Sequence, residues 1–506
     1  MIFLLMMAIP ACAALALLVP RARFLPDDAS LGRFAILVSG ATLLVGLSAM
    51  TAFDFSAASR TQLGVNRPWA SSIGLRFHLG VDGISLPLVV LTALLTFLCF
   101  LYTYRHPPAG GRLRLLAALL LVLEIGMLGT FVALDLILFF VFFEVVLIPM
   151  FAVILLWGGP DRRAAATKFI LYTLLGSGLL LAGMLLVAVN AGTLDMTELA
   201  RRHGAGVSHG VQVAGFLLMM LGFGVKAPMW PLHTWLPDAH TEAPTVGSVL
   251  LAGVLLKMGT YGLVRIAVPS APDGARSCAT ALGLLAVVGI VYGALACLAQ
   301  TDLKRMIAYS SVGHMGFVLL GIATLTPVGM NAALFGNIAH GLITGLLFFL
   351  AGSVKDRYGT GDLARIGGGM LGTAPRLASF LTFAAVASLG LPGLAGFWGE
   401  MLALLGAYRP DAGLSRPAFV TFMALGGLGA VLTAAYFLRL LAKITHGRPR
   451  ADAVEVAETA SIAAPTAYEY AAWVPLVALT LLVGLWPKTL LAVTSGPVRA
   501  LFGGLG

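Results

Sequence analysis

Long apolar runs, separated by short polar or Gly/Pro-containing breaks, fill almost the whole chain. About 20 apolar residues span a bilayer as a helix, whereas barrel strands would give alternating stretches of about 10 residues. The pattern therefore predicts an all-α polytopic membrane protein with about 14 transmembrane helices. We expect these helices near residues 1–20, 31–53, 84–104, 113–133, 134–157, 166–190, 210–236, 245–268, 279–300, 302–324, 329–354, 376–408, 416–444 and 468–495.

Two of the apolar runs contain helix breakers at comparable places. Pro228 and Pro231 interrupt the run at 210–236, and Pro392 interrupts the run at 376–408. A proline removes a backbone donor and clashes with the preceding turn, which leaves carbonyl groups in need of a polar partner. In transporters, paired broken helices at matching positions of two repeats indicate the ion path. Because five runs, an odd number, separate the two breaks, the sequence predicts two inverted five-helix repeats, each with a broken helix.

These repeats divide the chain into four parts. We expect three N-terminal transmembrane helices and an extracytoplasmic loop in residues 1–112, and the first five-helix repeat in 113–270. The second, inverted repeat would occupy residues 271–444, and residues 445–506 would hold a cytoplasmic loop and the last helix. The other loops are short, so the function is expected to reside within the membrane.

Composition and charge agree with this class of protein. Hydrophobic residues make up 59% of the chain and charged residues 11%, which excludes an ordinary soluble globule. The net charge of +10 comes from Lys and Arg placed singly or in small groups between the runs, so we expect no nucleic acid partner. Counted on alternate sides of the membrane, 19 lie on one side and 11 on the other, and only two of the 32 lie inside runs. The positive-inside rule then places both termini outside the cytoplasm, with the first apolar run retained as a helix and not cleaved as a signal.

Ionisable residues inside the runs are the candidate functional groups. A charge at mid-bilayer costs about 3 kcal/mol or more, so such residues usually face a cavity or a partner. A chain of acids, lysines and histidines can pass a proton, because moving one member of a pair changes the other's affinity for it. A membrane histidine can equally be a hydrogen-bonded strut between helices. The candidates for proton translocation are Glu144, Lys226, Lys257, His314, His340 and Glu400, with Glu124 and Asp135 as possible supporting residues.

Other clusters carry weaker signals. The group His233, Asp238, His240 and Glu242 has no ligand spacing of the HExxH kind, and we interpret it as contacts in a turn between helices. Residues 367–372 match GxGxxG but follow no strand, so they predict no nucleotide site. Four scattered cysteines form no CxxC pair. We therefore expect neither a metal nor a cofactor in this chain.

Three stretches resemble a known family. They are FVALDLILFFVFFEVVLIPMF at 131–151, FGVKAPMWPLHTWLPDAHTEAPTVGSVLLAGVLLKMGTYGLVR at 223–265, and TDLKRMIAYSSVGHMGFV at 301–318. They are similar to the antiporter-like subunits of respiratory complex I, the proton-pumping NADH:quinone oxidoreductase, and most similar to the M-type subunit, the counterpart of mitochondrial subunit 4. The glutamate at position 400 also favours the M-type over the N-type, which usually has lysine there.

The resemblance implies a fold and a function. It implies fourteen transmembrane helices, with helices 4–8 and 9–13 as inverted repeats. It further implies that Glu144 and Lys226 form a coupled acid–lysine pair and that Lys257 is the central proton carrier. His314 and His340 would continue the path toward Glu400.

The same resemblance sets the expected surroundings. Flavin, iron–sulfur clusters and quinone would belong to partner subunits, and L-type and N-type antiporter-like subunits would flank this chain in a bacterial inner membrane. The alternative is a subunit of a multisubunit cation/proton antiporter, which shares the Glu–Lys–Lys core. A membrane component of an energy-conserving hydrogenase and a purely structural scaffold are further alternatives.

Overall fold

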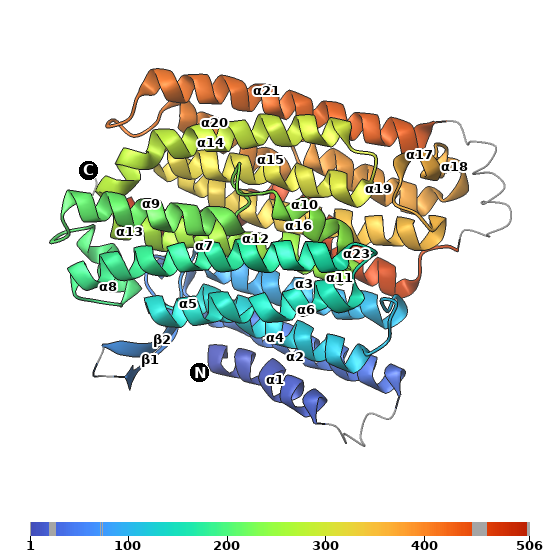
Figure 1. The fold of residues 1–506 in the computed structure, drawn as a ribbon, viewed down its shortest axis with the longest axis horizontal. Helices are drawn as coiled ribbons and strands as arrows, with labels where there is room; N and C mark the ends of the chain where they lie inside the picture. Colours follow the sequence, from blue (N-terminus) through green and yellow to red (C-terminus); the bar gives the residue numbers. More distant parts are fainter. Residues whose placement is uncertain (1, 20–26, 71, 73, 448–462, 503–506) are drawn as a thin grey trace.

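The fold is a bundle of long helices that run side by side along one direction (Figure 1). A computed structural model describes residues 2–19, 27–70, 72, 74–447 and 463–502. The N-terminal part has three helices. A short 3-10 turn and an antiparallel hairpin lie between the second and the third helix, in the region expected to be an extracytoplasmic loop. These elements are α1 (Ile2–Leu18), α2 (Asp28–Ala52), η1 (Phe55–Ala57), β1 (Gln62–Ala70), β2 (Leu75–Val81) and α3 (Leu86–Arg105).

The range expected to form the first repeat contains a series of helices that ends in one long, irregular helix over residues 245–270. The series is α4 (Leu113–Val132), α5 (Leu136–Val145), α6 (Leu147–Trp157), α7 (Arg162–Ala191), α8 (Met196–Arg202), α9 (His209–Lys226) and α10 (Trp235–Glu242). The final helix consists of α11 (Thr245–Leu250), η3 (Leu251–Leu255), α12 (Leu256–Gly262), η4 (Leu263–Ala267) and α13 (Val268–Ser270). The run expected at 134–157 is thus divided into α5 and α6, with the junction at Val146.

The second repeat and the C-terminal part complete the bundle. The repeat comprises α14 (Pro272–Ala299), α15 (Leu303–Ala323), α16 (Pro327–Tyr358), α17 (Leu363–Ile366), α18 (Met370–Thr373), α19 (Pro375–Ser388), α20 (Ala395–Tyr408), α21 (Arg416–Leu441) and η5 (Ala442–His446). The last expected run, 468–495, is two helices instead of one, α23 (Ala467–Leu485) and α24 (Lys488–Phe502). Pro487 lies between them and cannot donate a backbone hydrogen bond, which favours the break.

The helical membrane fold is confirmed, whereas the exact number of spans stays a prediction. Within the described residues, 12 helices are long and apolar enough to cross a membrane. The helix α1 is shorter, with 17 residues, and the pair α19 and α20 has 14 residues each. These two places account for the difference from the expected count of about 14.

Both expected helix breaks are present as irregular segments. The helix α9 ends at Lys226, Pro228 and Pro231 follow, and α10 begins at Trp235. In the second repeat α19 ends at Ser388, Pro392 follows, and α20 begins at Ala395. Each break leaves backbone groups near the middle of the repeat without the regular ladder of a helix.

Matching aspartate pairs show how the two repeats are related. Asp135 and Asp195 form an isolated antiparallel bridge, and each caps the helix that follows it, α5 or α8. Asp302 and Asp362 form an equivalent bridge and cap α15 and α17. The helices α8 and α17 lie at opposite ends of the bundle (Figure 1). The same motif therefore occurs once at each end, as inverted repeats require.

Burial separates a central group of helices from a peripheral one. The apolar window of the helix at 245–270 is 100% buried, and that of α16 is 94% buried. The corresponding windows of α2 and α21 are 28% buried, so these helices present most of their surface to the surroundings. Lys257 and His340 are carried by the two central helices, where protein surrounds them on all sides.

Candidate proton-translocation site

Lys257 lies at the centre of the bundle, on α12, and its side chain is fully buried. The π-helical segments η3 and η4 flank α12, and π-helical turns are frequent at functional sites. The ammonium nitrogen donates to the carbonyl oxygen of Ala252, within η3, and lies 2.5 Å from Nδ1 of His340. The lysine is therefore held by one backbone oxygen and one imidazole.

The contacts continue from His340 to the second broken helix. The ring centroids of His340 and His314 are 5.7 Å apart, and Nδ1 of His314 lies 3.0 Å from a carboxylate oxygen of Glu400. Glu400 is on α20, directly after the break. Four of the six residues singled out in the sequence thus form one chain across α12, α16, α15 and α20.

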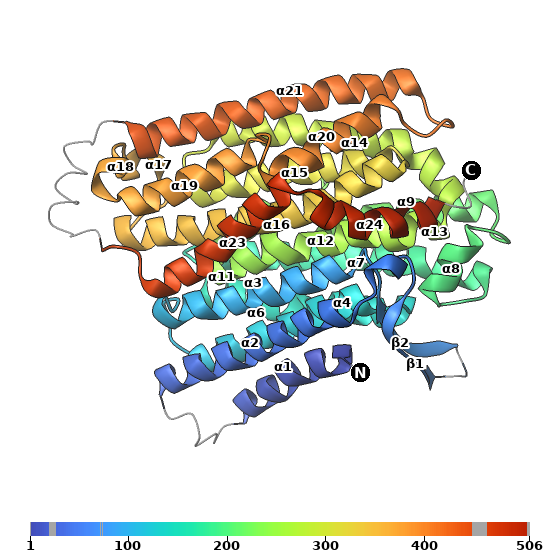
Figure 2. The ribbon, with the colours of Figure 1, turned by 180° about the vertical axis from the view of Figure 1, so that it is seen from behind.

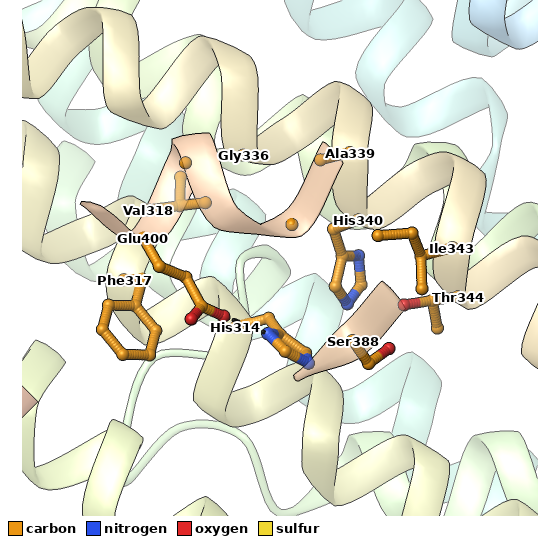
Figure 3. A pocket seen from close by; sticks show the side chains of 12 residues that line it. His314, Phe317, Val318, Gly336, Ala339, His340, Ile343, Thr344, Ser388 and Glu400 are labelled. Atoms are coloured by element: carbon orange, nitrogen blue, oxygen red, sulfur yellow. Dashed lines mark hydrogen bonds and ion pairs between the residues drawn. The ribbon is translucent and has the colours of Figure 1, made fainter. Parts of the chain in front are cut away.

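A cavity lies along this chain (Figure 3). It offers about 30 Å³ for the centres of water molecules, and a single water needs about 10–15 Å³ by this measure. The hydroxyl groups of Thr344 and Ser388 lie on its wall beside the two rings. The cavity is therefore large enough for about two water molecules between His340, His314 and Glu400.

Glu144 and Lys226 are close in space but are not in direct contact. Glu144 accepts a hydrogen bond from the hydroxyl of Ser177 on α7. The Lys226 ammonium is buried, has no hydrogen-bond partner among the described residues, and lies 4.6 Å from the centroid of the Phe143 ring. The aromatic face supplies a weak attraction to the cation. The acid–lysine pairing implied by the family resemblance is therefore not a hydrogen-bonded pair in this conformation.

The two supporting candidates have different surroundings. Glu124 on α4 is fully buried, and neither of its carboxylate oxygens has a hydrogen-bond partner among the described residues. Asp135 accepts hydrogen bonds from the backbone amides of Ile137 and Leu138 at the start of α5, and one from Arg76 of the hairpin. Asp135 is thus a helix cap and a hairpin anchor, and it does not touch the chain of Lys257.

The cluster interpreted as a turn consists of two different halves. Asp238 contacts Lys168 at 2.8 Å and Arg305 at 3.2 Å, and Glu242 accepts from the amide of Asp161. The two acids thus connect this segment to neighbouring elements, as the interpretation of the cluster as a turn between helices expects. Among the residues that the structure describes, no group of three or more His, Cys, Asp and Glu is arranged to hold a metal ion.

The histidines of that cluster point inward, and sequence reasoning missed this. His240 on α10 is fully buried, neither ring nitrogen has a hydrogen-bond partner among the described residues, and its ring stacks on Phe348 of α16 at 4.5 Å. The charges of Lys304 and Lys257 both act on it. Lys304 is itself buried and donates to the carbonyl of Ala243 at 2.8 Å. The sequence feature that could have identified His240 is its position in the second half of a broken helix.

The glycine-rich segment at 367–372 is a connection between short helices. Gly367 is the C-cap of α17 and Gly369 precedes α18, and both have positive φ angles. The glycines therefore serve a tight turn between two helices, in which a residue with a side chain would be strained.

Comparison with known proteins decides the family. The sequence profile of the NADH:quinone oxidoreductase/Mrp antiporter transmembrane family matches residues 133–426. The NADH-quinone oxidoreductase subunit M of Rhodobacter capsulatus is 41% identical over 488 residues, which cover 94% of this chain and 91% of that protein. The chain belongs to this family. The matched residues of the NADH:quinone oxidoreductase/Mrp antiporter family include all six candidate proton-translocation residues.

Solved structures of the NADH:quinone oxidoreductase/Mrp antiporter family have the same fold. A chain of the respiratory complex I from Thermus thermophilus with bound NADH superposes with a TM-score of 0.86 at 30% identity, and the match covers 100% of both chains. A chain of the Mrp complex from Dietzia sp. DQ12-45-1b gives a TM-score of 0.83 at 25% identity, over 99% of this chain and 52% of that one. The antiporter-like subunit fold is therefore confirmed.

Proposed function

We propose that this chain is a proton-translocating membrane-arm subunit of an NADH:quinone oxidoreductase. The observation that carries the proposal is the series of side chains from Lys257 through His340 and His314 to Glu400, with a cavity beside the two histidine rings. The similarity to subunit M over almost the whole chain supports this enzyme class. The oxidation of NADH and the reduction of quinone take place in other subunits, which hold the flavin, the iron–sulfur clusters and the quinone.

The geometry allows a proton to move along this series in discrete steps. The Lys257 ammonium gives its proton to Nδ1 of His340, 2.5 Å away, and becomes a neutral amine. His340 releases a proton from its other ring nitrogen toward His314, through water in the cavity of about 30 Å³. His314 then protonates the Glu400 carboxylate at 3.0 Å. Glu400 would release the proton toward the outside.

We assign the entry of protons from the cytoplasm to Lys304 and His240. Lys304 is at the start of α15, at the end of the bundle that carries more Lys and Arg, and the charges of both Lys304 and Lys257 act on His240. The imidazole of His240 has both nitrogens free to take part in the transfer among the described residues. A proton passed inward by His240 would restore the Lys257 ammonium.

Glu144 and Lys226 would control this transfer. Lys226 is a buried cation held over an aromatic ring and not paired with a carboxylate. If Lys226 approaches Glu144, its charge is neutralised and Lys257 binds a proton more tightly; if it moves away, Lys257 binds a proton less tightly. Quinone reduction in partner subunits would drive that movement.

The surroundings follow from the same proposal. The chain would lie in the bacterial inner membrane between L-type and N-type antiporter-like subunits, with both termini outside the cytoplasm. The larger number of Lys and Arg at the opposite side supports this orientation.

The test measures NADH oxidation and proton transport together in the assembled complex. We expect Lys257→Ala and Glu144→Ala to lower proton transport by at least about ten-fold, because the first removes an ionisable group from the path and the second removes the carboxylate that controls it. Glu144→Gln should lose transport and Glu144→Asp should retain it, because the carboxylate must ionise. Full proton transport in both alanine variants would contradict the proposal.

A cation/proton antiporter subunit is the second candidate. The family includes Mrp antiporters, and the Mrp complex chain shares the fold at 25% identity. Neighbouring genes separate the two: an NADH:quinone oxidoreductase requires flavin and iron–sulfur subunits, and an antiporter requires small antiporter subunits. Proton transport that depends on NADH, without added sodium, would exclude the second candidate.

A further inference from the structure

A second cavity lies far from the proton path, between α2, α3 and α4. The start of α2, the end of α3 and the start of α4 meet at the end of the bundle that also carries α17 and α18 (Figure 2). The volume of the cavity is about 250 Å³. Its lining consists of Asp28, Ala29, Leu31, Gly32, Ala35, Phe100, Thr103, Tyr104, Arg105, Pro107, Leu113, Leu116, Ala117 and Leu120.

The inner walls of this cavity are apolar. Leu31, Phe100, Leu116 and Leu120 are buried and form the walls, and Ala35 and Ala117 leave the space between them. The cavity opens to the surroundings at one end, and its apolar walls favour an apolar ligand over water. In a membrane, the available apolar ligand is a lipid acyl chain, which is as apolar as leucine.

The mouth of the cavity carries one cation and one anion. Arg105 is exposed at the end of α3, and its guanidinium carbon lies 5.7 Å from the centre of the Tyr468 ring. Asp28 is exposed in the first turn of α2. Both residues line the cavity and are exposed, and neither forms an ion pair with another described residue. Opposite charges at one mouth fit a headgroup that also has both signs.

We propose that this cavity binds a diacyl phospholipid with a phosphoethanolamine headgroup. One acyl chain lies between α2, α3 and α4, the phosphate pairs with Arg105, and the primary ammonium pairs with Asp28. An anionic lipid without an ammonium could pair its phosphate with Arg105 but would leave the Asp28 carboxylate without a cation, which favours the zwitterionic lipid. The lipid would close the gap between the three helices, and this inference is independent of the proposed proton path.

The test uses the assembled complex in nanodiscs of phosphatidylcholine. One sample contains a trace of phosphatidylethanolamine with a photoactivatable diazirine in its acyl chain, and the other contains phosphatidylglycerol with the same chain. After illumination, labelled peptides are identified by mass spectrometry. We expect the phosphatidylethanolamine probe to label peptides from residues 28–35, 100–107 and 113–120, at least about five-fold more than the phosphatidylglycerol probe does.

Variants distinguish the tail from the headgroup. Ala117→Phe fills the apolar space and should lower labelling by at least about five-fold. Arg105→Gln, at an exposed position, removes the charge that pairs with the phosphate and should lower labelling by about five-fold. Asp28→Asn should remove the preference for phosphatidylethanolamine over phosphatidylglycerol. The matched control is Leu37→Phe, because Leu37 is on α2, is 71% exposed and does not line the cavity, so labelling should not change.

Two results would overturn the proposal. If Ala117→Phe leaves the labelling of all three segments unchanged, no acyl chain occupies the cavity. If both probes label equally and Asp28→Asn has no effect, the headgroup assignment is wrong.

Discussion

Glu144 lies beside lipid-facing residues and still holds a polar partner. Val141 and Ile148, one turn away on either side along the chain, are 40% and 72% exposed, and Glu144 itself is half-buried. Its contact with the Ser177 hydroxyl fixes the carboxylate against α7. This hydrogen bond limits how far the carboxylate can turn toward Lys226.

The first prediction concerns this hydroxyl. Ser177→Ala removes the hydrogen bond, so we expect proton transport per NADH oxidised to fall by about two- to ten-fold, in line with about 0.5–1.5 kcal/mol for one hydrogen bond. Ser177→Thr keeps a hydroxyl and should retain most transport. Equal transport in the alanine and threonine variants would show that the contact has no part in the function.

The second prediction concerns His240. His240→Leu preserves the bulk of the buried side chain and removes the proton-carrying ring, so we expect proton uptake from the cytoplasm to fall by at least about ten-fold. His233→Leu is the matched control: His233 is also buried, but its ring packs against the edges of Tyr292 and Tyr309 and not near Lys257. Stopped-flow uptake in vesicles measures both, and equal losses would argue against the entry route.

At the residue scale, the sequence was enough to predict the residues of the proton path but not the residues around it. Lys257, His314, His340 and Glu400 stood out because a charge in an apolar run is costly, and the structure brings these four together. His240 did not stand out, because Asp238 and Glu242 on either side made the segment look like a polar turn. Only the helix register of α10 shows that the acids face outward and the histidine faces inward.

A polar network connects three helices at the arginine-rich end. Glu469 at the start of α23 accepts two hydrogen bonds from Arg357 of α16, each 2.8 Å long, and one from Ser353. His106 follows the last residue of α3 and contacts Asp356 at 3.1 Å and Glu469 at 3.5 Å. The network thus fixes α23 to the central helix α16.

The third prediction is a pH dependence of stability. Burial alone would lower the pKa of His106, but the hydrogen bonds to Asp356 and Glu469 outweigh it and raise the pKa from 6.5 to about 9. Because the folded-state pKa is raised, the stabilisation is fully present below about pH 6.5 and is lost as the pH rises through about 9.

The melting temperature of the purified protein should therefore fall between pH 7 and pH 10. This fall should be smaller in His106→Gln, which cannot carry the charge. His209→Gln is the matched control, since His209 is exposed at the start of α9, and it should keep the dependence of the unmodified protein. An identical slope in His106→Gln would exclude His106 as the titrating group.

At the element scale, apolar length predicted most helices and prolines predicted both breaks. The division of 134–157 into α5 and α6 was missed, although Pro149 lies three residues after the junction at Val146 and cannot donate a hydrogen bond to the carbonyl of Val145, the last residue of α5. The hairpin β1–β2 was also missed, since its strands lack a clear alternation of buried and exposed residues: β1 is mostly exposed, and β2 ends in three consecutive buried residues.

On the scale of the whole molecule, the inversion of the repeats places equivalent elements on opposite sides of the membrane. The capped pair Asp135–Asp195 lies at the end that carries α8, and Asp302–Asp362 at the end that carries α17 (Figure 1). The spacing of the prolines was enough to predict the inversion. The orientation in the membrane rests on the distribution of Lys and Arg alone.

The fourth prediction tests this orientation. In a Cys12→Ser background, Ala205→Cys after α8 and Arg365→Cys in α17 place single thiols at exposed positions of opposite ends. A membrane-impermeant maleimide should label Ala205→Cys in right-side-out vesicles and Arg365→Cys in inside-out vesicles, because the arginine-rich side faces the cytoplasm. The three remaining cysteines are buried and should stay unlabelled. The reverse labelling would place both termini in the cytoplasm.

The helix at 245–270 has a further consequence for which substitutions the protein tolerates. A helix that touches lipid accepts almost any apolar residue on its outer side, so a scan of all substitutions shows tolerance once per helical turn. The apolar window of this helix is wholly buried, and a Cβ atom added to Gly259 or Gly262 would collide with Phe223 or the backbone of Ala227. A scan of residues 245–270 should therefore show no tolerant side, and the helix that carries Lys257 should accept fewer amino-acid substitutions than the lipid-facing helices.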